Sequence, residues 1–337
     1  MHRNFKFIGF VSIALLLAFS APARAQSPAS FFKGKDLTIH IGSPPGGSVD
    51  LTARTVALSL GKYTGTNIIA TNGPLGGQGR GTFNYIVKKA KPNGLSFGWH
   101  IGAAAAVYQM YGVGVEYDLR AMTWIGIIAP TRNSLIVNAK KYPTLDALRK
   151  AKQFFLAGGA KQSVDSQQGM VALEALGVPY RLVTGYQGTG PIRTAILRGE
   201  VDGMVRDYAG SEGEISAGNL AALIHLGPDR DPRLPKVPTI LELGQVKEPF
   251  KTLLEATAKA GYFLVGHPGI PADRVQFLRA ALKKVVEDPE FINRATKAGF
   301  TPSYGDPEET RRVVAGLLNM SQAQKEKIFA LAEKASK

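Results

Sequence analysis

Short apolar runs along the chain alternate with longer segments whose apolar residues recur every three or four positions. The first run, 37–41, is followed by a glycine loop and then by Val49, Ala53, Val56 and Leu60, which share one face of a helix. The strands predicted in this way are 37–41, 67–71, 95–101, 124–129, 135–137, 154–157, 180–183, 204–205 and 220–226. The predicted helices are 49–60, 82–89, one capped by Thr144 that runs to 152, 166–176, 272–287, 289–298 and a stretch from 307, and further helices separate the strands 180–183, 204–205 and 220–226. Strands that alternate with helices predict an α/β fold of mostly parallel sheets with helices on both faces.

Composition limits the classes to which the protein can belong. Its 337 residues, 45% of them hydrophobic and 20% charged, suffice for two folded domains and argue against disorder. The absence of cysteine excludes disulfides, thiolate zinc sites, iron–sulfur clusters, a cysteine nucleophile and a lipid-modified N-terminal cysteine. The formal charge of +15 comes from scattered lysines and arginines without a basic run. We therefore expect a mild preference for anionic small molecules and no nucleic-acid partner.

The N-terminus predicts export. A basic region over 2–6 precedes an apolar run over 7–19, and 23–25 reads Ala-Arg-Ala, which fits a signal-peptidase site. A membrane anchor is the alternative, but the run is shorter than the roughly 18 residues needed to span a bilayer. Residues 1–25 are therefore predicted to be a cleaved signal peptide, and the mature protein is expected to be soluble in the periplasm.

Four loops that join a predicted strand to a helix are rich in glycine and hydroxyl residues: 43–48, 73–79, 158–163 and 185–190. Ligands of open α/β sheets bind at the carboxyl ends of the strands, where a helix N-terminus offers unpaired N–H groups to an anion. Because such loops occur in both halves of the chain, they predict two lobes whose cleft closes on a small anion. The side chains that can add contacts are the hydroxyls of Ser48, Ser163, Ser166 and Thr189 and the ring of Tyr186.

An enzyme is the second class considered. Residues 94–98 match the G-x-S-x-G pattern of serine hydrolases, but a nucleophile elbow needs a helix directly after the serine, and strand residues follow Ser96. Phosphate-binding and dinucleotide-binding loops are absent. The histidines of the mature chain are far apart in the sequence and are predicted to be structural. We expect no catalytic residues, no cofactor and no metal, and an α/β hydrolase-like enzyme stays the alternative.

Several motifs, in this order and spacing, resemble one family over essentially the whole mature chain. They are PPGGSVD (44–50) with AR (53–54), GPLGG (73–77), KPNG (91–94), GYQGTGP (185–191), LRGEVD (197–202) and LPKVPTILELG (234–244). The chain is similar to the periplasmic receptors of tripartite tricarboxylate transporters, also called Bug receptors. This resemblance implies a two-lobe periplasmic-binding-protein fold of type II, each lobe a mainly parallel sheet flanked by helices, and ligand capture by closure of the lobes.

The resemblance also implies the organisation of the chain and the contacts of its site. Lobe 1 is discontinuous, 26–130 and 238–337, and lobe 2 is 131–237. The ligand is a small organic anion, mostly a carboxylate, held by backbone N–H groups and waters. Carried over by position, its contacts are Gly46, Gly47, Ser48, Asp50, Gly77, Gln78, Gly79, Ser163, Val164, Ser166, Tyr186, Gly188 and Thr189. The expected partners are the membrane permease subunits of the transporter, and the receptor is expected to be a monomer.

Two positions depart from the family pattern. Asp165 replaces a glycine of the third loop, where a carboxylate repels an anion unless it points away or pairs. The family often has Asp at the end of the strand after Val201-Asp202, and Arg206 stands there in this chain. Arg206 can clamp a ligand carboxylate with two hydrogen bonds, or it can pair with Asp165. We hypothesise that the exchange alters the choice of ligand, which makes Arg206 a further candidate contact. A receptor that feeds a signalling system instead of a transporter stays open.

Overall fold

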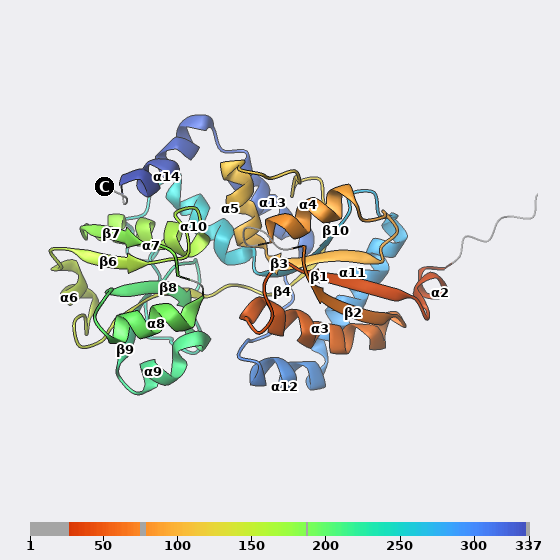
Figure 1. Cartoon of the computed structure of the whole chain (residues 1–337), viewed down its shortest axis with the longest axis horizontal. Coiled ribbons are helices and arrows are strands. Elements are labelled where there is room, and N and C mark those ends of the chain that lie inside the picture. Colours follow the sequence, from red (N-terminus) through yellow and green to blue (C-terminus); the bar gives the residue numbers. More distant parts are fainter. Residues whose placement is uncertain (1–26, 75–78, 187, 335–337) are drawn as a thin grey trace, which may run out of the picture.

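The computed structural model describes residues 27–74, 79–186 and 188–334, which form two lobes side by side (Figure 1). Each lobe contains one five-stranded sheet with helices packed against it. The predicted signal peptide lies outside the described residues. Among the residues that are described, no helix is both long and apolar enough to cross a membrane.

The sheet of lobe 1 is built from strands at both ends of the chain. Its strands are β1 (Asp36–Ile41), β2 (Asn67–Asn72), β3 (Ser96–Ile101), β4 (Thr123–Ala129) and β10 (Tyr262–Gly266). Their order is β2-β1-β3-β10-β4, and β10 runs antiparallel to both neighbours. The helices that precede lobe 2 in the chain are α2 (Pro28–Phe32), α3 (Ser48–Thr64), α4 (Arg80–Lys88) and α5 (Gly102–Tyr111). The helices that follow it are α10 (Phe250–Lys259), α11 (Ala272–Glu287), α12 (Pro289–Lys297), α13 (Pro307–Leu318) and α14 (Gln322–Lys334).

The sheet of lobe 2 repeats this arrangement. Its strands are β5 (Asn133–Asn138), β6 (Phe154–Ala157), β7 (Tyr180–Val183), β8 (Gly203–Asp207) and β9 (Leu220–His225). Their order is β7-β6-β8-β5-β9, with β5 antiparallel to β8 and β9. The helices of this lobe are α6 (Leu145–Arg149), α7 (Val164–Ala175), α8 (Thr189–Leu197), the 3-10 helix η1 (Tyr208–Ser211) and α9 (Glu212–Ser216). As predicted, the Thr144 side chain caps α6 by accepting from the Ala147 N–H.

The two-lobe α/β architecture is confirmed, but each sheet is mixed rather than purely parallel. The antiparallel strands β5 and β10 are the ones that the chain forms directly after it passes from one lobe to the other. A short apolar run predicts a buried strand, but it does not indicate whether that strand pairs parallel or antiparallel to its neighbours.

Four elements are absent from the sequence prediction: α2, α5, α10 and β10. Residues 102–107 of α5 are all buried, so this helix has no polar face and no helical period. β10 is a short apolar run, and hydrophobic periodicity alone does not distinguish a strand from a buried helix in such a run. By contrast, α10 buries one face through Leu253, Leu254 and Thr257, a pattern that the sequence does contain.

The chain crosses between the lobes twice. The first crossing, 130–132, joins β4 to β5, and the second, 226–261, joins β9 to β10 and includes α10. The lobe boundaries that follow from the family resemblance stay a prediction. The C-terminal helix α14 packs against α7 of lobe 2, and Lys334 pairs with Glu174 there. The last helix therefore connects the lobes instead of belonging to lobe 1 alone.

One buried apolar cluster extends through both lobes and includes residues of α5, α7, α10, α13 and α14. Tyr111 of α5 stacks on Phe329 of α14, with ring centroids 4.2 Å apart. The Tyr111 hydroxyl also accepts a hydrogen bond of 2.7 Å from Gln167 Nε2 of α7. These contacts join the lobes outside the two crossings, because burial of shared apolar surface favours their association.

Gly261 is required where β10 begins beside the first crossing. A Cβ atom there would lie 1.8 Å from the Ala129 carbonyl oxygen and 2.8 Å from the Pro130 Cα. We expect Gly261→Ala to lower the free energy of unfolding by about 1–3 kcal/mol or more. The measurement is urea denaturation followed by circular dichroism.

Gly316→Ala is the matched control. A Cβ atom at Gly316, in α13, would meet no atom within 4 Å, and glycine inside a helix costs roughly 0.5–1 kcal/mol relative to alanine. This variant should therefore be slightly more stable than the original protein. Equal effects of the two substitutions would contradict the close packing at the crossing.

Candidate functional site

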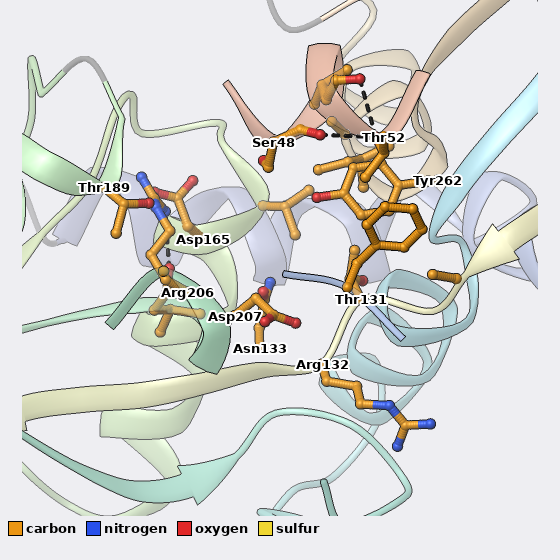
Figure 2. A pocket seen from close by; sticks show the side chains of 18 of the residues that line it. Ser48, Thr52, Thr131, Arg132, Asn133, Asp165, Thr189, Arg206, Asp207 and Tyr262 are labelled. Atoms are coloured by element: carbon orange, nitrogen blue, oxygen red, sulfur yellow. Dashed lines mark hydrogen bonds and ion pairs between the residues drawn. The ribbon is translucent and has the colours of Figure 1, made fainter. Parts of the chain in front are cut away.

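A cavity of about 620 Å³ lies between the lobes, at the first crossing. Figure 2 shows Ser48, Thr52 and Tyr262 of lobe 1 on one side and Asp165, Thr189 and Arg206 of lobe 2 on the other. Thr131, Arg132 and Asn133 come from the crossing and the start of β5. One chain thus supplies both walls and the connection between them.

Four helices begin at this cavity, two from each lobe. The lining residues include Ser48 and Val49 of α3, Ile101 before α5, Val164 of α7, and Gly188 and Thr189 at the start of α8. None of the four helices has a side-chain cap. By contrast, Asp288 and Asp306 cap α12 and α13. The first N–H groups of a helix have no partner within it. At α5 the Gly102 and Ala103 N–H groups donate to the Gly261 and Ala260 carbonyls, so backbone donors face the cavity mainly at α3, α7 and α8, and all four ends bring positive dipole ends to it.

The loop before α3 is held in shape by Asp50. The Asp50 carboxylate accepts hydrogen bonds from the Gly46 N–H (3.0 Å), Arg54 Nε (3.0 Å) and Asn72 Nδ2 (2.8 Å). Burial alone would raise the pKa of Asp50, but these hydrogen bonds hold it below its ordinary value. Asp50, Gly46 and Gly47 are not among the residues that line the cavity. In this structure they position the helix end, and Ser48 is the residue of the loop that lines the cavity.

Tyr262 and His100 complete the wall of lobe 1. Burial raises the pKa of Tyr262 to about 12, against the opposing effect of a hydrogen bond with the Ser48 side chain. Burial lowers the pKa of His100 to about 4, so its imidazole is neutral at pH 7. Gly79 packs against this ring: a Cβ atom would lie 2.8 Å from His100 Cγ, and φ is +87°. Gly79 supports the wall without lining it, and Gly77 and Gln78 lie outside the described residues.

The wall of lobe 2 contains the two residues that depart from the family pattern. Arg206, on β8, forms an ion pair with Asp165, in the first turn of α7 (Figure 2). Its Nη1 also donates to the Val205 carbonyl at 2.9 Å. Of the two roles considered for Arg206, the structure therefore shows the pairing with Asp165. Both residues line the cavity, as Val164 does.

The other predicted contacts of lobe 2 divide into two groups. Tyr186, Gly188 and Thr189 line the cavity. Ser163 and Ser166 are fully buried and do not line it. Ser163 Oγ lies 2.7 Å from the Ala160 carbonyl oxygen and 3.0 Å from Ser166 Oγ, so these hydroxyls stabilise the loop before α7.

A second group of charges in the cavity wall is absent from the sequence prediction. Arg233 lies 3.2 Å from Asp207 and 2.5 Å from Asp231, and its guanidinium lies over the ring of Tyr208. Burial would lower the pKa of Arg233, but the two carboxylates outweigh burial and raise it. Asp207 follows Arg206 directly at the end of β8, which is the one local signal that could have indicated it. Arg233 comes from a distant loop, so no sequence spacing connects it to this cavity.

The G-x-S-x-G serine lies elsewhere. Ser96 opens β3, five further strand residues follow it, and its Oγ lies 3.0 Å from His40 Nε2. It does not line the cavity and does not sit in a strand–turn–helix elbow. In the described ranges, no group of three or more histidine, aspartate or glutamate side chains could hold a metal ion.

Comparisons with known proteins agree with this geometry. The sequence model of the tripartite tricarboxylate transporter family receptor matches residues 52–329. The chain is 28% identical to the UPF0065 protein in the TAR-I ttuE-ttuC' intergenic region of Agrobacterium vitis, over 90% of this chain and 85% of that protein. It is 24% identical to BugT of Bordetella pertussis, over 90% of this chain and 93% of that protein.

Solved structures share the fold. A TctC solute binding protein from Polaromonas superposes with a TM-score of 0.70 at 20% identity, covering 88% of this chain and 98% of that one. A Rhodopseudomonas palustris protein solved with adipate gives a TM-score of 0.67 at 23% identity, with 89% and 97% covered. MatC from the same organism, solved with bound malate, gives 0.62 at 22% identity, with 90% and 99% covered. Because the family match extends through both lobes that enclose the cavity, this protein belongs to the receptor family of the tripartite tricarboxylate transporters.

Proposed function

We propose that the protein captures a small organic anion, a carboxylate, in the cavity between its lobes and delivers it to the membrane subunits of a tripartite tricarboxylate transporter. The observation that carries this proposal is the convergence on one cavity of four helix N-termini that lack side-chain caps, two from each lobe. The solved relatives with bound malate and adipate support a carboxylate as the ligand.

Capture follows from the division of the site between the lobes. A ligand that touches α3 and α5 on one side and α7 and α8 on the other makes all its contacts only when the lobes are close together. Such a ligand binds the closed form better than the open form and shifts the population toward it. The shared apolar cluster and the two crossings keep the lobes together in either form.

The remaining parts of the proposal concern place and assembly. Receptors of this family are periplasmic, and the basic and apolar segments over 2–25 support export with a cleaved signal peptide. Both cavity walls come from one chain, which supports action as a monomer. Ser96 lies outside the cavity, which supports binding without turnover.

The first prediction concerns ligand class. Mono-, di- and tricarboxylates, aromatic acids and amino acids are screened by thermal unfolding, each beside the compound in which every carboxylate is replaced by an amide. A true ligand present at a hundredfold excess over its Kd should stabilise the native state by about 2.7 kcal/mol and raise Tm. The amides should have little effect, because they do not bring a negative charge to the helix ends. Failure of every acid, or equal shifts with acids and amides, would overturn the proposal.

The second prediction tests the helix ends directly at Gly47, the N-cap of α3. Its backbone is extended, with φ −83° and ψ 170°, and a Cβ atom would meet nothing within 4 Å, so other residues fit there. Gly47→Asp places a carboxylate on the first N–H groups of α3. The unliganded protein should gain a few tenths of a kcal/mol, while affinity for the carboxylate found above should fall about tenfold or more through like-charge repulsion.

Gly47→Asn is the matched control, because it caps the same N–H groups without a charge. Calorimetric titration should show a smaller loss of affinity for Asn than for Asp. If Gly47→Asp binds the carboxylate as tightly as the original protein, the end of α3 does not take part in binding.

A further inference from the structure

The charged side chains that line the cavity already have partners. Arg206 is paired with Asp165, and Arg233 with Asp207 and Asp231. Arg132 Nη1 donates to the Arg230 carbonyl at 3.3 Å. Figure 2 shows the Arg132 guanidinium pointing away from Arg206 and Asp207. The five internal residues outside the described ranges, 75–78 and 187, are Leu, Gly, Gly, Gln and Gln, which carry no ionisable side chain. His100 is neutral at pH 7, because burial lowers its pKa to about 4.

Asp165 occupies the place that a ligand carboxylate would take on lobe 2. It lies in the first turn of α7, is only 9% exposed, and forms its ion pair with the one arginine that β8 directs at this helix end. A helix N-terminus and a guanidinium are the two groups that bind carboxylates best in proteins. At this end of the cavity, the chain's own carboxylate already holds the guanidinium and lies in the first turn of the helix.

The ends of α3 and α8 remain for the ligand. The first turn of α8 contains no acidic residue, and the Asp50 carboxylate in the first turn of α3 is held by the Gly46 N–H, Arg54 and Asn72 outside the cavity lining. At α5 the Gly102 and Ala103 N–H groups already donate to the Gly261 and Ala260 carbonyls. A single carboxylate can therefore bind at α3 or α8. A second carboxylate near α7 would lie beside Asp165, and the cationic side chains that line the cavity already have partners there. The burial of an unpaired charge is costly.

We propose that Asp165 is a specificity-determining residue that excludes dicarboxylates, so that the receptor takes a monocarboxylate whose far end is a neutral hydrogen-bond donor such as an amide or hydroxyl. This inference rests on the proposed function and narrows it. A donor at the far end meets the oxygens of Asp165 and Asp207 in the cavity wall. The malate and adipate bound by the solved relatives are dicarboxylates, so the selectivity of this chain differs from theirs.

The test compares ligands of matched shape and different charge. Succinate, adipate and terephthalate are each titrated calorimetrically beside the monoamide of the same acid: succinamate, adipamate and 4-carbamoylbenzoate. For at least one of the three pairs, the one whose length fits the cavity, the monoamide should bind at least about tenfold more tightly than the diacid. The reason is that burial of an unpaired carboxylate costs more free energy than burial of a hydrogen-bonded amide. Tighter or equal binding of the diacid in every pair that binds would overturn the inference.

Variants then show whether Asp165 is the cause. Asp165→Asn releases Arg206 and should raise diacid affinity about tenfold, with a smaller change for the monoamide. Adding Arg206→Gln to this variant should remove that gain, because the gain depends on the released guanidinium. Asp118→Asn is the matched control: Asp118 pairs with Arg120 away from the cavity, so the preference should stay unchanged.

The outcomes separate the two proposals. If folded Asp165→Asn, checked by circular dichroism, keeps the original preference, Asp165 does not determine specificity, whatever the ligand. If diacids bind the original protein best, the receptor function stands and this inference fails. If none of the six compounds and no member of the wider carboxylate screen binds, the proposed function itself fails.

Discussion

The unpaired N–H groups at the starts of helices are the constraint on which this molecule depends. Each helix leaves its first donors without internal partners. In α12 and α13 the chain supplies Asp288 and Asp306 as caps. At α3, α7 and α8 it supplies none, and these ends meet at one cavity together with the end of α5, where the Gly102 and Ala103 N–H groups donate to the Gly261 and Ala260 carbonyls. An external acceptor is the natural partner for donors arranged in this way, which is why the site favours an anion.

The fold brings these ends together by passing the chain between lobes twice. Strand β10 returns to the first sheet beside β4, and β5 enters the second sheet directly after β4. The first crossing forms part of the cavity wall, because Thr131 and Asn133 line the cavity. Gly261 lets the second crossing pass against the Ala129 carbonyl. The apolar cluster with Tyr111 and Phe329 adds a second connection, so the lobes are coupled by packing as well as by the backbone.

Paired charges then determine how the cavity differs from a simple anion site. The Arg206–Asp165 pair and the group of Arg233 with Asp207 and Asp231 pair the charged side chains that lobe 2 brings to the cavity wall. A ligand thus meets backbone donors and side-chain acceptors in the same space. The protein shares its fold with proteins solved with malate and adipate, and in its own cavity wall each charged side chain of lobe 2 is paired.

Local elements, glycine loops and the family could be predicted from the amino-acid sequence alone. Apolar period and glycine placement indicated most strands and helices within a few residues, because those signals depend on neighbours in the chain. The motifs from 44 to 244 indicated the receptor fold, and Ser48, Val164, Tyr186, Gly188, Thr189 and Arg206 do line the cavity. The direction of β5 and β10, the place of Arg233 in the cavity wall, and the position of Asp50, Ser163 and Ser166 outside the cavity lining became visible only in the folded chain. These depend on which distant segments lie together, and a sequence pattern does not state where a polar side chain finds its partner.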